Sequence, residues 1–333
     1  MYAKSDLRPY QVRAAQHIID NPASAMWMDV GTGKTATSLT AIEELFDRCE
    51  IYGVLVVAPK RVAESVWEQD SNEFEHTTRL TFERVMGTPK KRKAALLKRP
   101  HIFLINYENL QWLADEVMTT FIKRGRLPPF DMVVFDELSK MANSQSKRVK
   151  GFMKLFPYVT RQVGLTGTPA TRGLIKLHGQ YLCLDGGTRL TTGITNYRNL
   201  YFESDFMGYN WSIKKGAAEV IQRKIQDITY QISAKDYLDL PEVTFNDIWI
   251  DLPPKIRKQY DELEKDYFTK IDGEEVEVFS ESALQNKLLQ VCNGAYYTQP
   301  GSTDFEEVHE LKLDALEDVI EEMGGAPLLL SYN

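Results

Sequence analysis

Cysteine is scarce in this sequence of 333 residues, and it has neither a long apolar run nor a strong excess of either charge. Its three cysteines, Cys49, Cys183 and Cys292, are far apart and form no C-x-x-C pair, so neither a disulfide framework nor a structural zinc site is expected. No run approaches the ~20 apolar residues of a membrane helix, and residues 1–10 lack the apolar segment of a secretory signal. These absences predict a soluble cytoplasmic protein with no membrane partner.

The composition is otherwise that of a folded protein. It is 43% hydrophobic and 26% charged, which excludes wholesale disorder, and the length suggests roughly two domains. The net charge of −7 is unevenly distributed: residues 1–182 carry 26 Lys and Arg against 19 Asp and Glu, whereas residues 183–333 carry 14 against 28. The first part can therefore present a basic surface to nucleic acid, although ordinary solvated charges would give the same count.

Short apolar segments alternate with amphipathic segments from Leu7 to about Thr168. This alternation predicts βαβ units and a parallel sheet that is covered on both faces. The expected strands are residues 25–28, 54–58, 102–106, 132–136 and 162–166, and the expected helices are residues 10–19, 35–47, 62–74, 90–98 and 146–156.

The alternation stops after Pro169. Residues 243–252 alternate with period two and predict a strand, while helices are expected at 253–270, 282–291 and 309–323. We therefore predict an α/β lobe at 1–182, a mixed and largely helical extension at 183–308, and the start of a second α/β lobe at 309–333. Because an apolar segment follows Gly324-Gly325 at the very end, the sequence is expected to be a truncated or divided protein.

A glycine-rich loop carries the strongest signal for function. The segment 28–35 follows an apolar strand and precedes a helix, and Gly31-Thr32-Gly33 allows backbone N–H groups to approach a phosphate. In this pattern Lys34 reaches the β- and γ-phosphates of ATP and the Thr35 hydroxyl ligates Mg²⁺. The strict motif has glycine at position 28, where this chain has Met. The alternative is a glycine-rich turn that only caps a helix.

An acidic pair ends the strand predicted at 132–136. Asp136 fits the role of holding the Mg²⁺ ion and its water shell, and Glu137 fits the base that orients or deprotonates an attacking water. An Asp-Glu pair after an apolar strand is common and is weak alone. It becomes a strong signal here because it follows the glycine-rich loop: Asp136 lies about 100 residues after Lys34.

Two further polar groups fall at strand or helix ends. Thr166-Gly167-Thr168 ends the fifth expected strand with two hydroxyls that can sense the γ-phosphate, or that merely form a polar turn. Gln11 lies at an expected helix start, where its amide can pair with both a donor and an acceptor on the adenine edge. A solvated surface glutamine is the alternative for Gln11.

These motifs resemble those of superfamily 2 helicases, most closely the SWI/SNF-type DNA translocases. Their order and spacing match at Gln11, Gly31–Thr35, Pro59-Lys60-Arg61, Asp136-Glu137 and Thr166-Gly167-Thr168. Softer matches are Leu7–Gln11, Asn106–Leu110, Leu240-Pro241, Leu252–Pro254, Leu288–Asn293 and Lys312–Leu316.

The resemblance implies a RecA-like lobe of a two-lobed motor that closes on ATP and steps along nucleic acid, with duplex DNA favoured over single strands. It implies that Lys60 and Arg61 contact the nucleic-acid backbone and that Thr166 and Thr168 couple the two sites. One departure is Ser139, where the family often has a histidine. The family's arginine finger belongs to the second lobe, so weak hydrolysis is expected unless a downstream lobe or a second chain completes the motor.

We therefore expect an ATP-dependent DNA helicase or translocase, represented by its ATP-binding portion and of bacterial or viral origin. A nucleotide-gated DNA-binding module with little catalysis is the first alternative, and Glu137 argues against it because a pure switch needs no base. A P-loop kinase or small-molecule transferase is the second, and Thr166-Gly167-Thr168-Pro169 fits it poorly.

Overall fold

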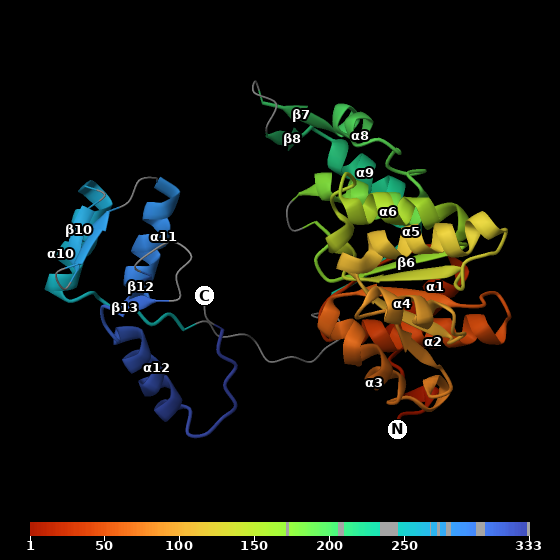
Figure 1. Ribbon diagram of the computed structural model, residues 1–333, viewed down its shortest axis with the longest axis horizontal. Coiled ribbons are helices and arrows are strands. Elements are labelled where there is room, and N and C mark those ends of the chain that lie inside the picture. Colours follow the sequence, from red (N-terminus) through yellow and green to blue (C-terminus); the bar gives the residue numbers. More distant parts are fainter. Residues whose placement is uncertain are drawn as a thin grey trace. The chain divides into compact units, whose positions relative to one another are not determined.

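The chain forms two compact units, Met1–Leu240 and Pro241–Asn333, in the computed structural model (Figure 1). The structure describes residues 1–170, 173–205, 210–233, 246–266, 268–271, 274–277, 281–297 and 304–331. Within these ranges, no helix combines the length and apolar character needed to cross a membrane.

A parallel sheet is the framework of the first unit. Its seven strands run in the order β3-β4-β2-β5-β6-β1-β9, and every neighbouring pair is parallel. The strands are β1 Ala23–Met28, β2 Val54–Ala58, β3 Phe82–Arg84, β4 Ile102–Asn106, β5 Met132–Asp136, β6 Arg161–Thr166 and β9 Thr229–Ile232. The predicted α/β, RecA-like fold with a parallel sheet is confirmed, and five of the strands lie where the sequence places them.

The helices of this unit lie on both faces of the sheet (Figure 1). They are α1 Pro9–Asp20, α2 Lys34–Asp47, α3 Trp67–Ser71, α4 Pro89–Leu96, α5 Leu110–Thr120, α6 Lys147–Leu155, α7 Leu177–Asp185, α8 Ile194–Tyr201 and α9 Ala217–Ile225. A short antiparallel pair, β7 Phe202–Ser204 and β8 Trp211–Ile213, follows α8. The helix predicted at 62–74 ends at Ser71, and its residues 62–66 form a π-helix, η2, before α3.

Two apolar cores fill the spaces between the sheet and its helices. Because successive side chains of a strand point to opposite faces, the strands β1, β2, β4 and β5 contribute to both cores. Phe103 and Phe135 pack with Phe152 of α6 on one face, and Val56 packs with Leu39 of α2 on the other. All five side chains are fully buried. This two-sided burial explains why the strand sequences are continuously apolar.

The second unit contains three helices and four short strands among the residues described. They are α10 Pro254–Asp266, β10 Phe268–Ile271, β11 Glu274–Glu277, α11 Glu281–Cys292, β12 Ala295–Tyr297, β13 Phe305–Glu307 and α12 Leu311–Glu322. The strands pair antiparallel, β10 with β11 and β12 with β13. A small core of Leu263, Leu284, Leu288, Val291 and Tyr296 holds the unit together.

Two predictions beyond residue 240 need correction. The strand expected at 243–252 is wrong for residues 246–252, which have no regular secondary structure; residues 243–245 lie outside the described ranges. The strand that continues the sheet is instead β9, Thr229–Ile232, which pairs with β1. The helix expected at 253–270 ends at Asp266, and residues 268–271 form β10. The predicted domain limits at 182 and 308 stay predictions.

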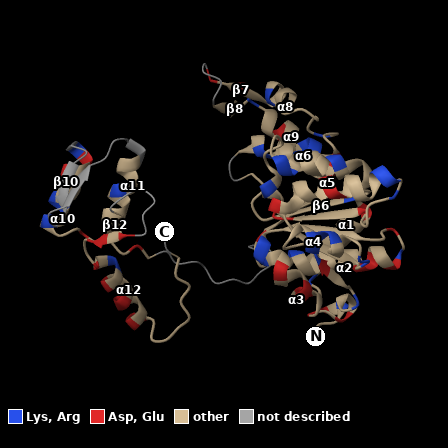
Figure 2. Cartoon of the chain, viewed as in Figure 1, with Lys and Arg blue, Asp and Glu red and all other residues tan. Residues whose placement is uncertain are grey.

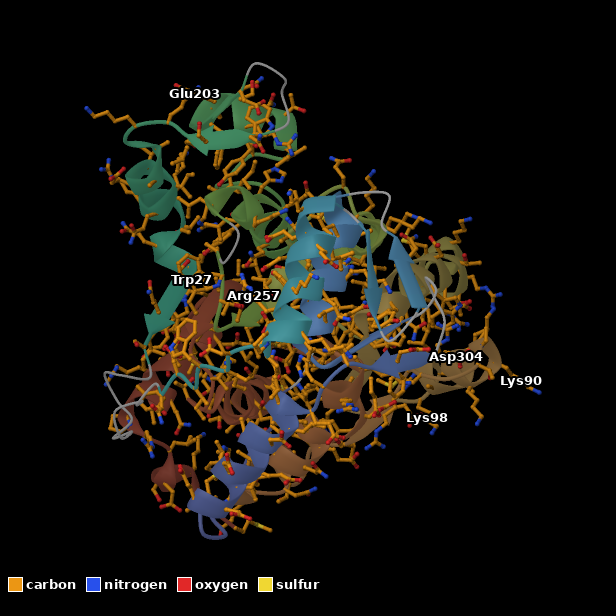
Figure 3. All side chains as sticks on the ribbon, turned by 90° about the vertical axis from the view of Figure 1, so that its left-hand side faces the viewer. Trp27, Lys90, Lys98, Glu203, Arg257 and Asp304 are labelled. Atoms are coloured by element: carbon orange, nitrogen blue, oxygen red, sulfur yellow. The ribbon has the colours of Figure 1, made fainter. Side chains whose placement is uncertain are left out.

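Charge is distributed unevenly over the elements, as the sequence indicates (Figure 2). Acidic residues follow one another on α12, at Asp314, Glu317, Asp318, Glu321 and Glu322, whereas α6 carries Lys147, Arg148, Lys150 and Lys154. On α4, Lys90 projects outward (Figure 3), but Lys93 pairs with Glu116 at 3.0 Å. Lys98, just after α4, pairs with Glu83 at 2.8 Å. Ion pairs within the unit therefore engage part of this basic segment.

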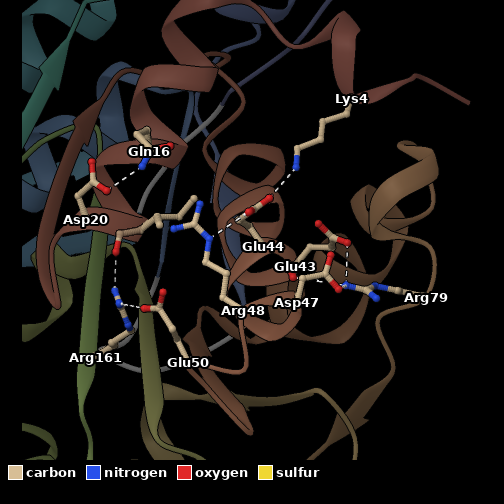
Figure 4. A network of polar contacts seen from close by, with 11 residues as sticks. Lys4, Gln16, Asp20, Glu43, Glu44, Asp47, Arg48, Glu50, Arg79 and Arg161 are labelled. Carbon is tan, nitrogen blue, oxygen red and sulfur yellow. Dashed lines mark hydrogen bonds and ion pairs between the residues drawn. The ribbon is translucent and has the colours of Figure 1, made fainter.

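Polar contacts join α1 and α2 to neighbouring segments near one edge of the sheet (Figure 4). Glu44 accepts from Lys4 at 2.9 Å and from Arg48 at 3.0 Å. Arg161 pairs with Glu50 and donates to the carbonyl groups that end α1. Exposed pairs of this kind contribute at most about 1 kcal/mol each. The two apolar cores therefore supply most of the stability.

We expect Phe152→Ala to lower the free energy of unfolding by about 3–5 kcal/mol, the usual effect of deleting a buried aromatic ring. The Phe152 ring is fully buried and meets the Phe135 ring edge to face at 4.9 Å. Leu97→Ala is the control, because Leu97 is 69% exposed and its loss should change stability by less than about 0.5 kcal/mol. Urea denaturation followed by circular dichroism measures both; equal effects would contradict the assignment of the core.

Candidate nucleotide site

The loop between β1 and α2 requires glycine for two separate reasons. Gly31 and Gly33 have φ angles of 81° and 76°, in the left-handed region that side chains with a Cβ rarely adopt. At Gly33 a Cβ atom would also lie 2.2 Å from Nε2 of Gln11. The loop conformation and its close approach to α1 therefore depend on the glycines that the sequence motif contains.

Lys34 and Thr32 hold the loop together. The buried Thr32 hydroxyl donates to the Asp29 carbonyl at 2.7 Å. Lys34 Nζ donates to the carbonyls of Met28 and Asp29 at 2.9 and 3.1 Å. Burial lowers the pKa of Lys34, and the nearby carboxylates of Asp136, Glu137 and Asp29 oppose that shift. The lysine thus lies in the field of the acidic pair that ends β5.

Met28 departs from the strict motif without disturbing the loop. Its side chain is 1% exposed and belongs to the apolar core, because Met28 is the last residue of β1. Only its carbonyl contacts Lys34, and any residue type supplies that carbonyl. Met28 in place of glycine therefore affects only the last residue of β1. The two positions that need a positive φ, 31 and 33, are still glycine.

Asp136 and Glu137 are fixed in different ways. Asp136 ends β5, and its Oδ2 accepts a hydrogen bond from Trp67 Nε1 at 2.9 Å. Burial raises the pKa of Asp136, whereas the Trp67 hydrogen bond and the Lys34 charge lower it. Glu137 adopts a φ of 69°, which is uncommon for a residue with a side chain. The Tyr107 hydroxyl donates to both carbonyl groups of this turn, at 2.9 and 3.1 Å.

The Glu137 carboxylate contacts two hydroxyl groups. Its Oε1 accepts from Thr166 Oγ1 at 2.9 Å and also from the Ser139 hydroxyl. Ser139 stands where the family often has a histidine, so a polar contact near the acidic pair is retained at this position. Thr168 donates its backbone N–H to Thr166 Oγ1 at 3.1 Å, while its side chain is exposed. The structure therefore brings Thr166 against Glu137 but leaves the Thr168 side chain at the surface.

Gln11 lies against the glycine-rich loop. Its Nε2 donates to the Thr32 carbonyl at 3.2 Å, and its Oε1 accepts from the Arg8 backbone N–H at 2.8 Å. The second contact belongs to a capping box at the start of α1. The structure thus places Gln11 beside the loop, with both ends of its amide bonded to the chain, and its contact with adenine stays a prediction.

Lys60 and Arg61 lie apart from the loop, directly after β2. Both are exposed, and Lys60 Nζ is 3.9 Å from Glu64. Because β2 and β5 are parallel neighbours, these cations follow the same edge of the sheet that Asp136 ends. Among the contacts of the described residues, neither cation touches Lys34 or the acidic pair.

Sequence reasoning missed the side chains that support the site. Trp67 and Asp70 were not singled out, and Tyr107 was noted only as part of the family-like segment Asn106–Leu110. Trp67 donates to Asp136, Asp70 lies near Thr35, and Tyr107 donates to the turn at Glu137. A buried tryptophan or tyrosine normally needs a partner for its N–H or O–H, which is the only local signal. The identity of that partner depends on how distant segments pack.

Magnesium fits the residues present at this edge. Thr35 and Asp136 are oxygen donors near Lys34, and Mg²⁺ usually takes one or two protein ligands together with phosphate oxygens and water. Across the described parts of the chain, no group of three or more His, Cys, Asp or Glu side chains is placed to hold a metal ion. A magnesium ion here would therefore depend on phosphate and water for most of its ligands.

The parallel sheet, the glycine-rich loop and the adjoining acidic pair define a RecA-like lobe of the superfamily 2 helicase type. The model of the family "Type III restriction enzyme, res subunit" matches residues 4–171, half of the chain. The chain belongs to this family. The resemblance to superfamily 2 helicases, inferred from the motifs, is thereby confirmed, and the likeness to the SWI/SNF type is one of fold.

One relative and two solved structures are similar over most of the chain. "Putative protein p41" of Acyrthosiphon pisum secondary endosymbiont phage 1 is 33% identical over 338 residues, covering 98% of this chain and 72% of that protein. The SWI2/SNF2 ATPase core of Sulfolobus solfataricus in complex with dsDNA has a TM-score of 0.57 at 20% identity, covering 96% of this chain. The same organism's SWI2/SNF2 ATPase core domain has a TM-score of 0.54 at 20% identity, covering 86%. This chain spans 65% and 57% of those two structures, less than two thirds of either, and at this identity they establish the fold alone.

We expect Gly33→Ala to weaken binding of a fluorescent ATP analogue at least tenfold, because the new Cβ would displace Gln11 and strain the loop. Gly216→Ala is a matched control: Gly216 has a φ of 77° and caps a helix, but no atom lies within 4 Å of its added Cβ. Both variants should lose some stability, about 1 kcal/mol or more from the positive φ. Equal nucleotide affinity in the two variants would show that the crowding at Gly33 has no role.

Proposed function

We propose that this chain is the ATP-binding portion of a DNA-dependent ATPase that moves along duplex DNA, as a helicase or a translocase. The observation that carries the proposal is the convergence of Lys34, Asp136 and Glu137 at one edge of the parallel sheet. Burial lowers the pKa of Lys34 there, and the charges of Asp136 and Glu137 oppose that shift, so the cation lies close to both carboxylates. This combination of a phosphate-binding cation, a metal ligand and a base is the set that ATP hydrolysis needs.

Each residue of the loop has a distinct task in this proposal. The backbone N–H groups of Gly31-Thr32-Gly33 and the start of α2 hold the phosphates of ATP, and Gln11 contacts the adenine. Lys34 exchanges its bonds with the loop carbonyls for bonds with the β- and γ-phosphates. Thr35 and Asp136 hold Mg²⁺, partly through water. When bound, the metal neutralises charge that develops on the phosphate oxygens.

Glu137 acts as the base that takes a proton from the attacking water. Among the described contacts, both hydrogen bonds to its carboxylate fall on Oε1, which leaves Oε2 to accept that proton. The Thr166 and Ser139 hydroxyls fix the orientation of the carboxylate. Thr166 also receives the Thr168 backbone N–H, so movement of the loop 166–168 reaches the base directly. This is how we propose that the two threonines couple hydrolysis to DNA.

DNA is the proposed partner. Lys60 and Arg61 supply exposed positive charge for phosphate contacts, and a solved structure of the same fold, the Sulfolobus SWI2/SNF2 ATPase core, contains dsDNA. We propose that residues 1–182 form the ATP-binding lobe, 183–308 an extension and 309–333 the start of a second lobe. The similarity to a phage protein supports a viral origin.

We expect Glu137→Gln to reduce ATP turnover by about 10²–10⁴-fold while ATP affinity changes little, since the amide cannot accept the proton. Lys34→Ala should instead abolish binding, because the phosphates lose their cation. Turnover with and without duplex DNA, together with fluorescent-nucleotide titrations, measures both effects. ATP-dependent DNA binding without turnover in the wild type would favour a nucleotide-gated binding module. Failure of the wild type to bind ATP would contradict the proposal outright.

We expect the double variant Lys60→Ala, Arg61→Ala to bind duplex DNA more weakly and with a flatter dependence on salt. Each lost phosphate contact removes about 0.9 from the slope of log affinity against log salt concentration. The double variant Arg257→Ala, Lys258→Ala is a matched control (Arg257 is labelled in Figure 3). Lys258 is also exposed, and its Nζ lies 3.8 Å from Glu262, four residues later, as Lys60 lies near Glu64. Fluorescence anisotropy at several salt concentrations measures the slopes. Equal slopes in the two double variants would exclude phosphate contacts at residues 60 and 61.

A further inference from the structure

One continuous helical segment follows β2 and ends near the metal ligands proposed above. It begins at Lys60, passes through the π-helix η2 at Val62–Val66, and continues as α3, Trp67–Ser71. A π-turn contains an extra residue, so it rotates the residues after it relative to those before it, and such turns occur often at functional sites. The exposed cations lie at the first end of this segment, and α3 is its last turn.

Trp67 connects this segment to Asp136. Its side chain is fully buried, and its Nε1 donates to Asp136 Oδ2 at 2.9 Å. The hydrogen bond fixes one carboxylate oxygen and leaves the other for a metal ion or its water. The indole packs in the apolar core that also contains Val54, Val56 and Ala58 of β2. A shift of α3 therefore moves Trp67 Nε1 relative to Asp136 at the end of β5.

Asp70 connects the same segment to Thr35. It lies three residues after Trp67 and thus near it on the surface of the helix. Burial raises the pKa of Asp70, and the neighbouring Thr35 hydroxyl opposes that shift, so the Asp70 carboxylate lies near Thr35. A threonine hydroxyl that donates its proton to a carboxylate presents a lone pair in another direction, which is the arrangement a metal ligand requires. Of the two proposed metal ligands, Asp136 on β5 is thus bonded to α3, and Thr35 on α2 lies near it.

We propose that residues 60–71 form a link through which DNA phosphates bound by Lys60 and Arg61 adjust the magnesium site, with Trp67 and Asp70 as its positioning residues. This inference rests on the function proposed above. A short helical segment moves as one piece, so a displacement at its first turn changes the Trp67 and Asp70 contacts together. DNA would thus alter the affinity for Mg²⁺-nucleotide without any DNA group entering the nucleotide site, and the coupling would be reciprocal.

The test uses the full chain and a fluorescent ADP analogue, titrated over a range of Mg²⁺ concentrations with and without a DNA duplex. In the wild type, DNA should shift the Mg²⁺ concentration that gives half-maximal nucleotide binding. Trp67→Phe keeps an aromatic ring in the core but removes the N–H donor. It should raise that concentration about tenfold, a typical effect for a group that orients a metal ligand, and should abolish the DNA-dependent shift while DNA affinity is unchanged.

Asp70 offers a second and independent variant. Asp70→Ala should raise the half-maximal Mg²⁺ concentration in the same way, whereas Asp70→Asn retains an oxygen acceptor for Thr35 and should restore most of the wild-type response. Trp112→Phe is the control for loss of an indole, because Trp112 lies on α5 against Arg92, away from the site. Thermal unfolding of each variant shows whether the fold is intact.

The outcomes separate this inference from the proposed function. If Trp67→Phe and Asp70→Ala change stability but leave the Mg²⁺ dependence and the DNA shift as in the wild type, both residues are purely structural and the link is wrong. If the wild type binds nucleotide with Mg²⁺ but DNA produces no shift, the link is also wrong while ATP binding stands. A wild type that binds no nucleotide overturns the proposed function, and the link with it.

Discussion

The site depends on keeping opposite charges close together at a partly dehydrated edge of the sheet. Burial removes water from both Lys34 and Asp136, which lowers the pKa of the lysine and raises the pKa of the aspartate. The charge of each residue opposes that shift in the other. They come from β1–α2 and β5, which are separated in the sheet by β6 alone. The register of three parallel strands therefore decides whether the charges compensate each other. The two apolar cores, which fix that register, are in this sense part of the site.

The sequence was sufficient for the elements that repeat a strong pattern. Strands buried on both faces appear as continuous apolar runs, so β2, β4 and β5 were located to the residue. The two edge strands, β3 and β9, were missed because each is short and only partly buried, which weakens the apolar signal. The alternation at 246–252 indicated a strand, but those residues are exposed and unpaired, and period two alone does not supply a neighbouring strand.

The same distinction holds for the site. Lys34, Asp136 and Glu137 were identified because phosphate and metal chemistry restricts both residue type and spacing. The supporting contacts of Trp67 and Tyr107 could not be predicted, because each joins segments whose proximity only the folded sheet establishes. The positive φ of Glu137 is a backbone constraint that could not be predicted from the sequence. The Tyr107 hydroxyl supports this conformation because it donates to the carbonyls of Asp136 and Glu137.

The capping box at the start of α1 has a consequence for how a base is selected. Gln11 bonds to the Arg8 N–H and the Thr32 carbonyl, which fixes the orientation of its amide and leaves one N–H and one lone pair for the proposed contact with adenine. An amide held in this way loses little further conformational freedom when a base pairs with it. A base with the opposite pattern of donors and acceptors, however, could pair only if the amide turned over and broke both bonds. In the proposed role, Gln11 would therefore discriminate against such bases, while the phosphates supply most of the binding energy.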